Sequence, residues 1–160
     1  MGKKGDVVLF PTVTGSNLER RRFRLPGDLD GELNWLILAF WQRHQGAVDT
    51  WMPLARNLEE RHPGFVTYEL PVIQSRSRVS QWFIDSGMRA GIPDRHVRSR
   101  TITLYLDKAP FLNALEIGND DTICSVVVDR SGAVLWRAAG PWSAESEADL
   151  LTFLASRSAA

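Results

Sequence analysis

The sequence contains very little cysteine, with Cys124 the only one among 160 residues. A single thiol excludes an intramolecular disulfide and any metal site built from several cysteines. Histidine is also scarce, and no two of the three histidines share the i, i+4 spacing of ligands on one helix face. We therefore expect no metal site and no bound cofactor.

The sequence also lacks an excess of either charge and any long hydrophobic run. Nineteen lysines and arginines balance nineteen aspartates and glutamates, whereas binders of nucleic acid or membrane surfaces usually carry a basic excess. No apolar run approaches the roughly 20 residues that cross a bilayer. The first run, residues 7–10, is too short for a secretion signal. We expect no nucleic-acid partner, no membrane insertion and a cytoplasmic location.

What remains is the composition of a globular protein. Hydrophobic residues make up 44% of the chain and charged residues 24%, which are ordinary values for a folded domain. The length fits one domain with its own core. No repeat, low-complexity stretch or linker interrupts the sequence, so we expect a single domain over residues 1–160.

Apolar periodicity predicts alternating strands and helices. Strands are expected at residues 7–10, 35–40, 65–70 and 101–106, and hairpins at 17–25 and 123–138. Helices are expected at residues 48–61, 79–90, 109–115 and 144–155, the last one capped by Ser143. This order predicts an α/β fold in which helices flank a central mixed β-sheet, with an N-terminal β-hairpin extension.

One ungapped segment, from Phe40 to Pro53, resembles the active-site segment of thioredoxins. Phe40 and Trp41 match the aromatic pair that ends the central strand, Gly46 matches the glycine of the dithiol motif, and Pro53 matches the proline that kinks the next helix. Residues 125–134 are similar to the strand–turn–strand of thioredoxins and of peroxiredoxin-like (AhpC/TSA-like) redoxins. The resemblance covers residues 7–154 and implies a thioredoxin-like fold.

The same resemblance places Gln45 and Val48 at the two cysteine positions of the dithiol motif. Thiol–disulfide exchange needs an attacking thiolate and a resolving thiol, and these residues supply neither. The peroxidatic cysteine of the peroxiredoxin branch would fall near Asp49, where no thiol occurs either. The resemblance therefore implies a degenerate active site, and we expect a protein that is not an enzyme.

The only thiol aligns on or beside the position that thioredoxins fill with a cis-proline, facing the active-site helix across a shallow groove. Two interpretations of Cys124 stay open: a reactive thiol in the groove, or a small buried hydrophobic residue. The candidate binding residues are those that the resemblance gathers around this groove: Trp41, Arg43, His44, Gln45, Val48 and Cys124.

A second candidate is the arginine-rich stretch at residues 89–100, which is longer than a loop of this fold requires. Its arginines could form a basic rim for an acidic partner or a phosphate, or pair with nearby carboxylates. They are Arg89, Arg95, Arg98 and Arg100. A small anion could also bind where the first main helix starts, at Gln45 and Gly46.

Three functions follow from these candidates. The first is a non-catalytic, protein-binding module of the assembly or chaperone type, whose partner is not specified. The second is a thiol-dependent redox protein, peroxidase-like or oxidoreductase-like, that works through Cys124. The third is a sensor of a small anion or metabolite.

Overall fold

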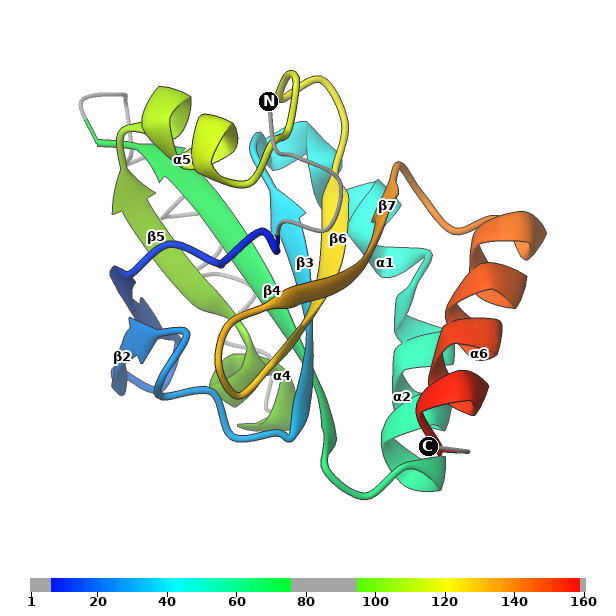
Figure 1. The fold of residues 1–160 in the computed structure, drawn as a ribbon. Helices are drawn as coiled ribbons and strands as arrows, with labels where there is room; N and C mark the ends of the chain where they lie inside the picture. Colours follow the sequence, from blue (N-terminus) through cyan, green and yellow to red (C-terminus); the bar gives the residue numbers. More distant parts are fainter. Residues whose placement is uncertain (1–6, 76–94, 159–160) are drawn as a thin grey trace.

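The computed structural model describes residues 7–75 and 95–158, which form a seven-stranded mixed sheet with helices on both faces (Figure 1). The strands are β1 (Val13–Asn17), β2 (Arg22–Leu25), β3 (Leu33–Ala39), β4 (Phe65–Gln74), β5 (Ile102–Leu106), β6 (Cys124–Asp129) and β7 (Val134–Ala139). Their order in the sheet is β2-β1-β5-β4-β3-β6-β7. β3 pairs parallel with β4 and antiparallel with β6. The expected α/β fold with a mixed sheet and an N-terminal hairpin is confirmed.

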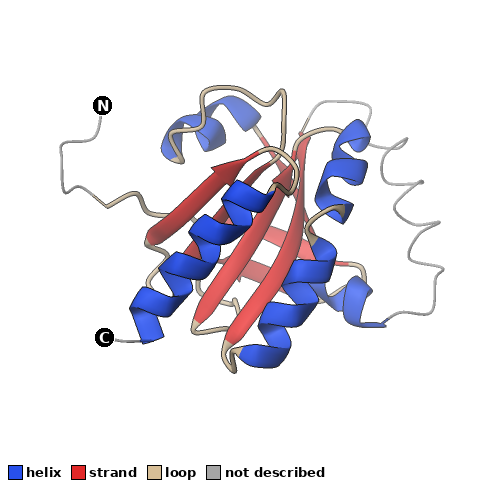
Figure 2. Ribbon diagram, turned by 90° about the vertical axis from the view of Figure 1, so that its right-hand side faces the viewer, coloured by secondary structure: helices blue, strands red, loops and turns tan. Residues whose placement is uncertain are grey.

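The helices divide between the two faces of the sheet. They are η1 (Gln42–His44), α1 (Gln45–Asp49), α2 (Met52–Arg61), α4 (Arg95–Arg100), α5 (Lys108–Ala114) and α6 (Ala144–Ser158). In Figure 2, α2 and α6 run across the face turned toward the viewer, and α5 lies on the other side. Among the residues that the structure describes, no helix is both long and apolar enough to cross a membrane.

The central strand β3 is buried on both faces, which explains its unbroken apolar run. Trp35 and Ile37 face α1, α2 and α6, whereas Leu36 and Leu38 face the opposite core. Trp35 is completely buried, and its ring packs edge-on against Trp51 with the centroids 5.3 Å apart. Such offset aromatic contacts add about 1 kcal/mol to the burial of the rings themselves.

The C-terminal elements follow their local signals closely. The turn between β6 and β7 is closed by Asp129, whose Oδ1 accepts the Ser131 hydroxyl and the N–H groups of Ser131 and Ala133. These hydrogen bonds lower the pKa of Asp129, and the bond from the Ser131 side chain has the largest effect. Ser143 caps α6 by accepting the Ser146 N–H at 3.1 Å. The hairpin at 123–138 and the capped last helix are therefore confirmed, as are the strand at 101–106 and the helix at 109–115.

Three of the expected boundaries are wrong. Residues 7–10 form only an isolated bridge between Leu9 and Ala133, and the N-terminal hairpin consists of β1 and β2. β4 continues through Pro71 instead of ending before it. Pairing with β3 ends at Pro71 and pairing with β5 begins at Val72, so the proline, which has no N–H, lies between the two sets of strand hydrogen bonds.

The third concerns the helix expected at 48–61, which is divided into α1 and α2. Pro53 lies in the first turn of α2, and a proline there cannot donate the N–H bond that would continue α1. The helix expected at 79–90 lies outside the described residues.

The close approach of β1 to β5 gives a test of the fold. A Cβ at Gly15 would lie 2.5 Å from the carbonyl oxygen of Thr103 and 2.6 Å from Leu104 Cδ2. We expect Gly15→Ala to lower the free energy of unfolding by about 2 kcal/mol, because an overpacked backbone contact must be relieved by distortion. Gly46→Ala is the matched control, since no atom lies within 4 Å of its added Cβ. Urea unfolding of both variants measures the difference, and equal stabilities would contradict the packing of β1 on β5.

Candidate functional site

The candidate site lies at the carboxyl end of β3, where the chain turns through η1 into α1. Val48 is completely buried on the inner side of α1, in the same core cluster as Trp51. Gln45 is partly buried, and its side-chain amide donates to Asp49 Oδ1 at 2.9 Å. The two positions that correspond to the dithiol are thus filled by a core residue and by an amide whose neighbour is a carboxylate. That carboxylate also disfavours an anion at Gln45 and Gly46.

His44 is buried beside the end of β3 and uses both ring nitrogens. Nδ1 accepts the backbone N–H of Phe40 at 3.0 Å, and Nε2 lies 3.2 Å from the carbonyl oxygen of Asp121. Since Nδ1 is an acceptor, the proton belongs on Nε2, which donates to Asp121. Burial, the largest cause, lowers the pKa of His44 below its usual value of 6.5. The imidazole is therefore a neutral structural connection between η1 and the loop before β6.

Lys108, the first residue of α5, binds the backbone carbonyl of Phe40, whose N–H is bound by His44. Its Nζ donates to the carbonyl oxygen of Phe40 at 2.6 Å and lies 3.6 Å from Asp120 Oδ2. Burial lowers the pKa of Lys108, whereas Asp120 opposes that shift. Both backbone polar groups of Phe40 are satisfied by buried ionisable side chains. We call His44, Lys108 and the Phe40 backbone the Phe40 clamp.

The Phe40 clamp also positions an exposed indole. Lys108 Nζ lies 3.6 Å from the ring centroid of Trp41, and the Arg43 guanidinium carbon lies 5.2 Å from it. Trp41 nevertheless keeps 41% of its surface exposed. Cation–π contacts of this kind are worth about 1 kcal/mol each, so the indole is held in place while part of it faces solvent.

A second indole, Trp142, flanks the other end of α1. Its backbone N–H donates to Thr50 Oγ1 at 2.8 Å, and its ring N–H donates to Glu147 at 2.8 Å. It is 42% exposed, close to the value for Trp41. Two half-exposed indoles therefore flank the two ends of α1.

The expectation that Cys124 faces α1 is wrong. Cys124 pairs with Leu38 in the sheet and shares its core cluster, whereas Val48 belongs to the cluster on the opposite face. The neighbouring Ile123 is the residue that lies on the α1 side, because successive residues of a strand alternate between faces. Cys124 is only 7% exposed, and burial raises the pKa of its thiol. Of the two interpretations, Cys124 therefore fits the small buried hydrophobic residue.

The peptide bond before Cys124 is trans, and no proline occurs at this position. Within the described ranges, the only cis peptide bond joins Leu25 and Pro26. The position that aligns with the cis-proline of thioredoxins therefore has an ordinary trans backbone, and the thiol of Cys124 does not line the groove expected there.

The arginine stretch is helical where the structure describes it and lies away from α1. Arg95, Arg98 and Arg100 belong to α4, which precedes β5, whereas α1 follows β3. Because β3 and β5 are both parallel to β4, they point in the same direction. The two groups lie at opposite ends of the sheet. The α4 arginines pair with Glu19 and Glu59 at 3.4–3.7 Å. Arg89 lies outside the described residues.

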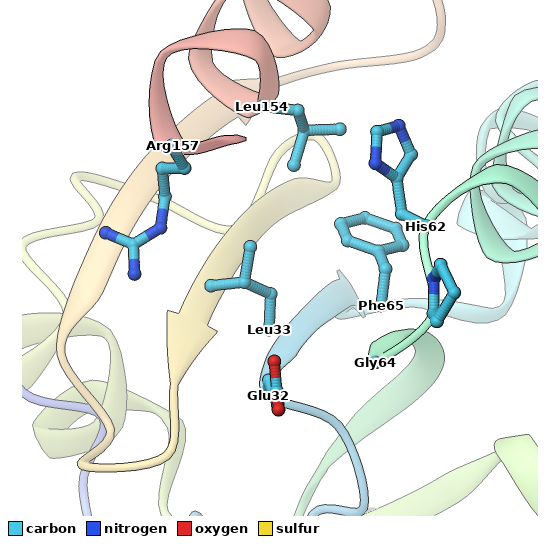
Figure 3. A pocket seen from close by; sticks show the side chains of 8 residues that line it. Glu32, Leu33, His62, Gly64, Phe65, Leu154 and Arg157 are labelled. Carbon is cyan, nitrogen blue, oxygen red and sulfur yellow. The ribbon is translucent and has the colours of Figure 1, made fainter. Parts of the chain in front are cut away.

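A separate cavity of about 250 Å³ opens between the start of β3, the turn before β4 and the end of α6 (Figure 3). Leu33, Phe65 and Leu154 contribute apolar side chains to it, and Glu32, His62 and Arg157 contribute polar ones. It shares no residue with the Phe40 clamp. In the described parts of the chain, no cluster of three or more histidine, cysteine, aspartate or glutamate side chains could hold a metal ion.

Comparison with known proteins identifies the fold class. The pneumococcal exposed lipoprotein thioredoxin Etrx1 of Streptococcus pneumoniae superposes with a TM-score of 0.53, at 14% identity over 89% of this chain and 98% of its own. A putative thiol:disulfide interchange protein DsbE of Chlorobium tepidum gives 0.57, at 16% identity over 93% and 95%. BsSco, a member of the Sco family of cytochrome c oxidase assembly proteins, gives 0.62, at 10% identity over 93% of each chain.

The chain therefore has a thioredoxin-like fold, and its single cysteine cannot form the dithiol pair of that fold. No family model and no curated protein matches the sequence.

Sequence reasoning missed Lys108, Asp120 and Asp121, which complete the site. One weak signal was available for the lysine. A cation at the first position of a helix is unfavourable with respect to the helix dipole, and Lys108 is the first residue of α5, so a partner elsewhere for its ammonium is favoured.

The burial of Cys124 predicts low thiol reactivity. At pH 8, we expect iodoacetamide to alkylate the folded protein at least about tenfold more slowly than the urea-unfolded chain, because the raised pKa and the closed core both limit the thiolate. Mass spectrometry of timed samples measures the rate at this single cysteine. A folded-state rate equal to the unfolded one would restore the thiol-dependent function.

The neutral His44 predicts a specific pH dependence. Its pKa is depressed in the folded state, so acidification from pH 7.5 protonates the unfolded chain first, below about pH 6.5, and stability falls until the folded pKa is reached. This loss has a slope of at most about 1.4 kcal/mol per pH unit. In His44→Gln the slope should disappear, whereas His62→Gln, outside the clamp, should keep it. Denaturant midpoints from pH 7.5 to 5 measure it, and an unchanged slope in His44→Gln would refute the lowered pKa of the buried His44.

Proposed function

We propose that this chain is a non-catalytic binding module of thioredoxin-like fold that holds a protein partner over the surface around α1. The Phe40 clamp is the observation that carries the proposal. His44 and Lys108 are the buried ionisable groups at the site, and both are committed to the backbone of Phe40. The two buried ionisable side chains of the site are therefore used for structure.

The thiol-dependent alternative has less support. A thiol must reach its substrate as a thiolate, and Cys124 is buried on the opposite face of the sheet from α1. No other residue of the chain is a cysteine.

A binding role is favoured by the way in which Trp41 is presented. Tryptophan is enriched among the few residues that dominate binding energies at interfaces. A side chain that is already held in place loses less conformational entropy on binding, and Lys108 and Arg43 both contact the Trp41 ring. Trp142 supplies a second half-exposed indole at the other end of α1.

The assembly- or chaperone-type role is the finer part of the proposal. One structural neighbour is described as a member of a family of cytochrome c oxidase assembly proteins, so this fold is found in proteins that assist assembly. We also propose a cytoplasmic location, which the single unpaired cysteine supports.

Affinity capture with Trp41 variants tests the proposal. The protein is used as bait in extracts of its native cells, and bound proteins are quantified by mass spectrometry. We expect a reproducible partner whose recovery falls at least about tenfold with Trp41→Ala, as for an interface hot spot. Tyr105→Ala is the matched control, because Tyr105 is an aromatic residue with the same 41% exposure.

A third variant tests whether the indole must be held in place. Lys108→Met keeps the length of the side chain but removes the ammonium above Trp41, so we expect partial loss of the same partner. Its folding is checked by circular dichroism. The absence of a reproducible partner, or an equal loss with Tyr105→Ala, would contradict binding through this surface.

A further inference from the structure

A second polar cavity, of about 550 Å³, lies at the opposite end of the sheet from α1. It opens between the β1–β2 hairpin, the residues before β3 and α4. Its lining is formed by Asn17, Glu19, Arg21, Asp30, Arg95, His96, Ser99 and Arg100. The volume falls within the range of about 300–1,000 Å³ that is typical of small-molecule sites.

The walls of this cavity are fixed to one another. The backbone N–H of Leu18 donates to the Arg98 carbonyl at 3.0 Å, and the Asn17 amide donates to the Ser99 carbonyl at 3.1 Å. Asn17 Oδ1 also accepts the backbone N–H groups of Glu19 and Arg21 at 2.9 Å. These bonds join α4 to the turn of the hairpin, so the side chains that line the cavity project from a connected backbone.

Positive groups outnumber negative ones in the lining. Three guanidinium groups face two carboxylates. The ion pairs are also long: Arg21 lies 3.5 Å from Asp30, and Arg95 lies 3.5 Å from Glu19. Charge-assisted hydrogen bonds between such groups are typically about 2.7–2.9 Å. The guanidinium groups therefore retain capacity for a better acceptor.

Arg100 has a guanidinium nitrogen without a hydrogen-bond acceptor among the described residues. Its Nη1 is buried, and no atom of the described chain accepts a hydrogen bond from it. The closest carboxylate oxygen, on Glu59, is 3.7 Å away, which is too long for a hydrogen bond. A buried donor without an acceptor costs about 1–3 kcal/mol, and an anion in the adjacent cavity would remove that cost.

We propose that this cavity binds a phosphorylated, hydroxyl-bearing small molecule, of the class of sugar phosphates and nucleoside monophosphates. Guanidinium groups bind phosphate in a bidentate manner, and Arg21, Arg95 and Arg100 would hold it. The carboxylates of Glu19 and Asp30 would repel a second anionic group but accept hydrogen bonds from hydroxyls. The cavity is larger than inorganic phosphate requires, which favours an organic phosphate. This proposal is independent of the partner surface around α1.

Calorimetric titration tests the site with ribose 5-phosphate, glucose 6-phosphate and adenosine monophosphate as probes. Ribose and inorganic phosphate are titrated in parallel. We expect at least one organic phosphate to bind at least about tenfold more tightly than inorganic phosphate, with no binding of ribose. Equal affinity for inorganic phosphate would overturn the role of the hydroxyl groups. No binding of any of the three probes at about 10 mM would overturn the site.

Arginine variants locate the binding. Arg100→Gln and Arg95→Gln should each weaken the tightest probe at least about fivefold, since each removes a charge-assisted contact. The Arg95 side chain is 87% exposed, so its replacement leaves folding intact even if Arg100→Gln is destabilised. Arg56→Gln, an exposed arginine on α2, is the control and should bind as the wild type does. Full affinity in both cavity variants would show that the probe binds elsewhere and would refute the assignment.

Discussion

The structure depends on how the buried central strand ends. Phe40 follows β3 and is completely buried, yet its N–H and C=O must be satisfied where the strand ladder stops. A buried backbone group without a partner costs free energy comparable to a lost hydrogen bond. Here His44 accepts from the N–H and Lys108 donates to the carbonyl. One link is local, four residues along the chain, and the other comes from 68 residues away, so the clamp connects the start of α1 with the start of α5.

This solution has a chemical consequence. The end of β3 and the start of α1 are where the resemblance to thioredoxins places the redox dithiol, and in this chain the same position is closed by structural contacts. Val48 completes one core and Cys124 contributes to the other. The ammonium of Lys108 contacts both the buried carbonyl of Phe40 and the half-exposed ring of Trp41. Stability and the presentation of an indole therefore depend on one side chain.

Most of the fold could be predicted because its signals are local. The apolar run of β3, the Asp129 turn and the Ser143 cap each lie within a few residues of the structure that they specify. The site was less predictable because its geometry is not local. The face that Cys124 occupies depends on its register with Leu38, and a shift of one residue would reverse it. The pairing of Lys108 with Phe40 joins segments 68 residues apart, and a lysine at the start of a helix is only a weak sequence signal of it.

The balanced charge of the chain illustrates the same distinction. A formal charge of zero counts residues, whereas recognition depends on where the fold places them. The structure brings Arg21 of the β1–β2 connection together with Arg95 and Arg100 of α4, although more than 70 residues separate them in the sequence. A local excess of guanidinium groups therefore exists within a neutral chain. The two ends of the parallel strands differ accordingly: one is closed by the Phe40 clamp, and the other holds an open cavity in which Arg21, Arg95 and Arg100 form only long ion pairs with carboxylates of the described residues.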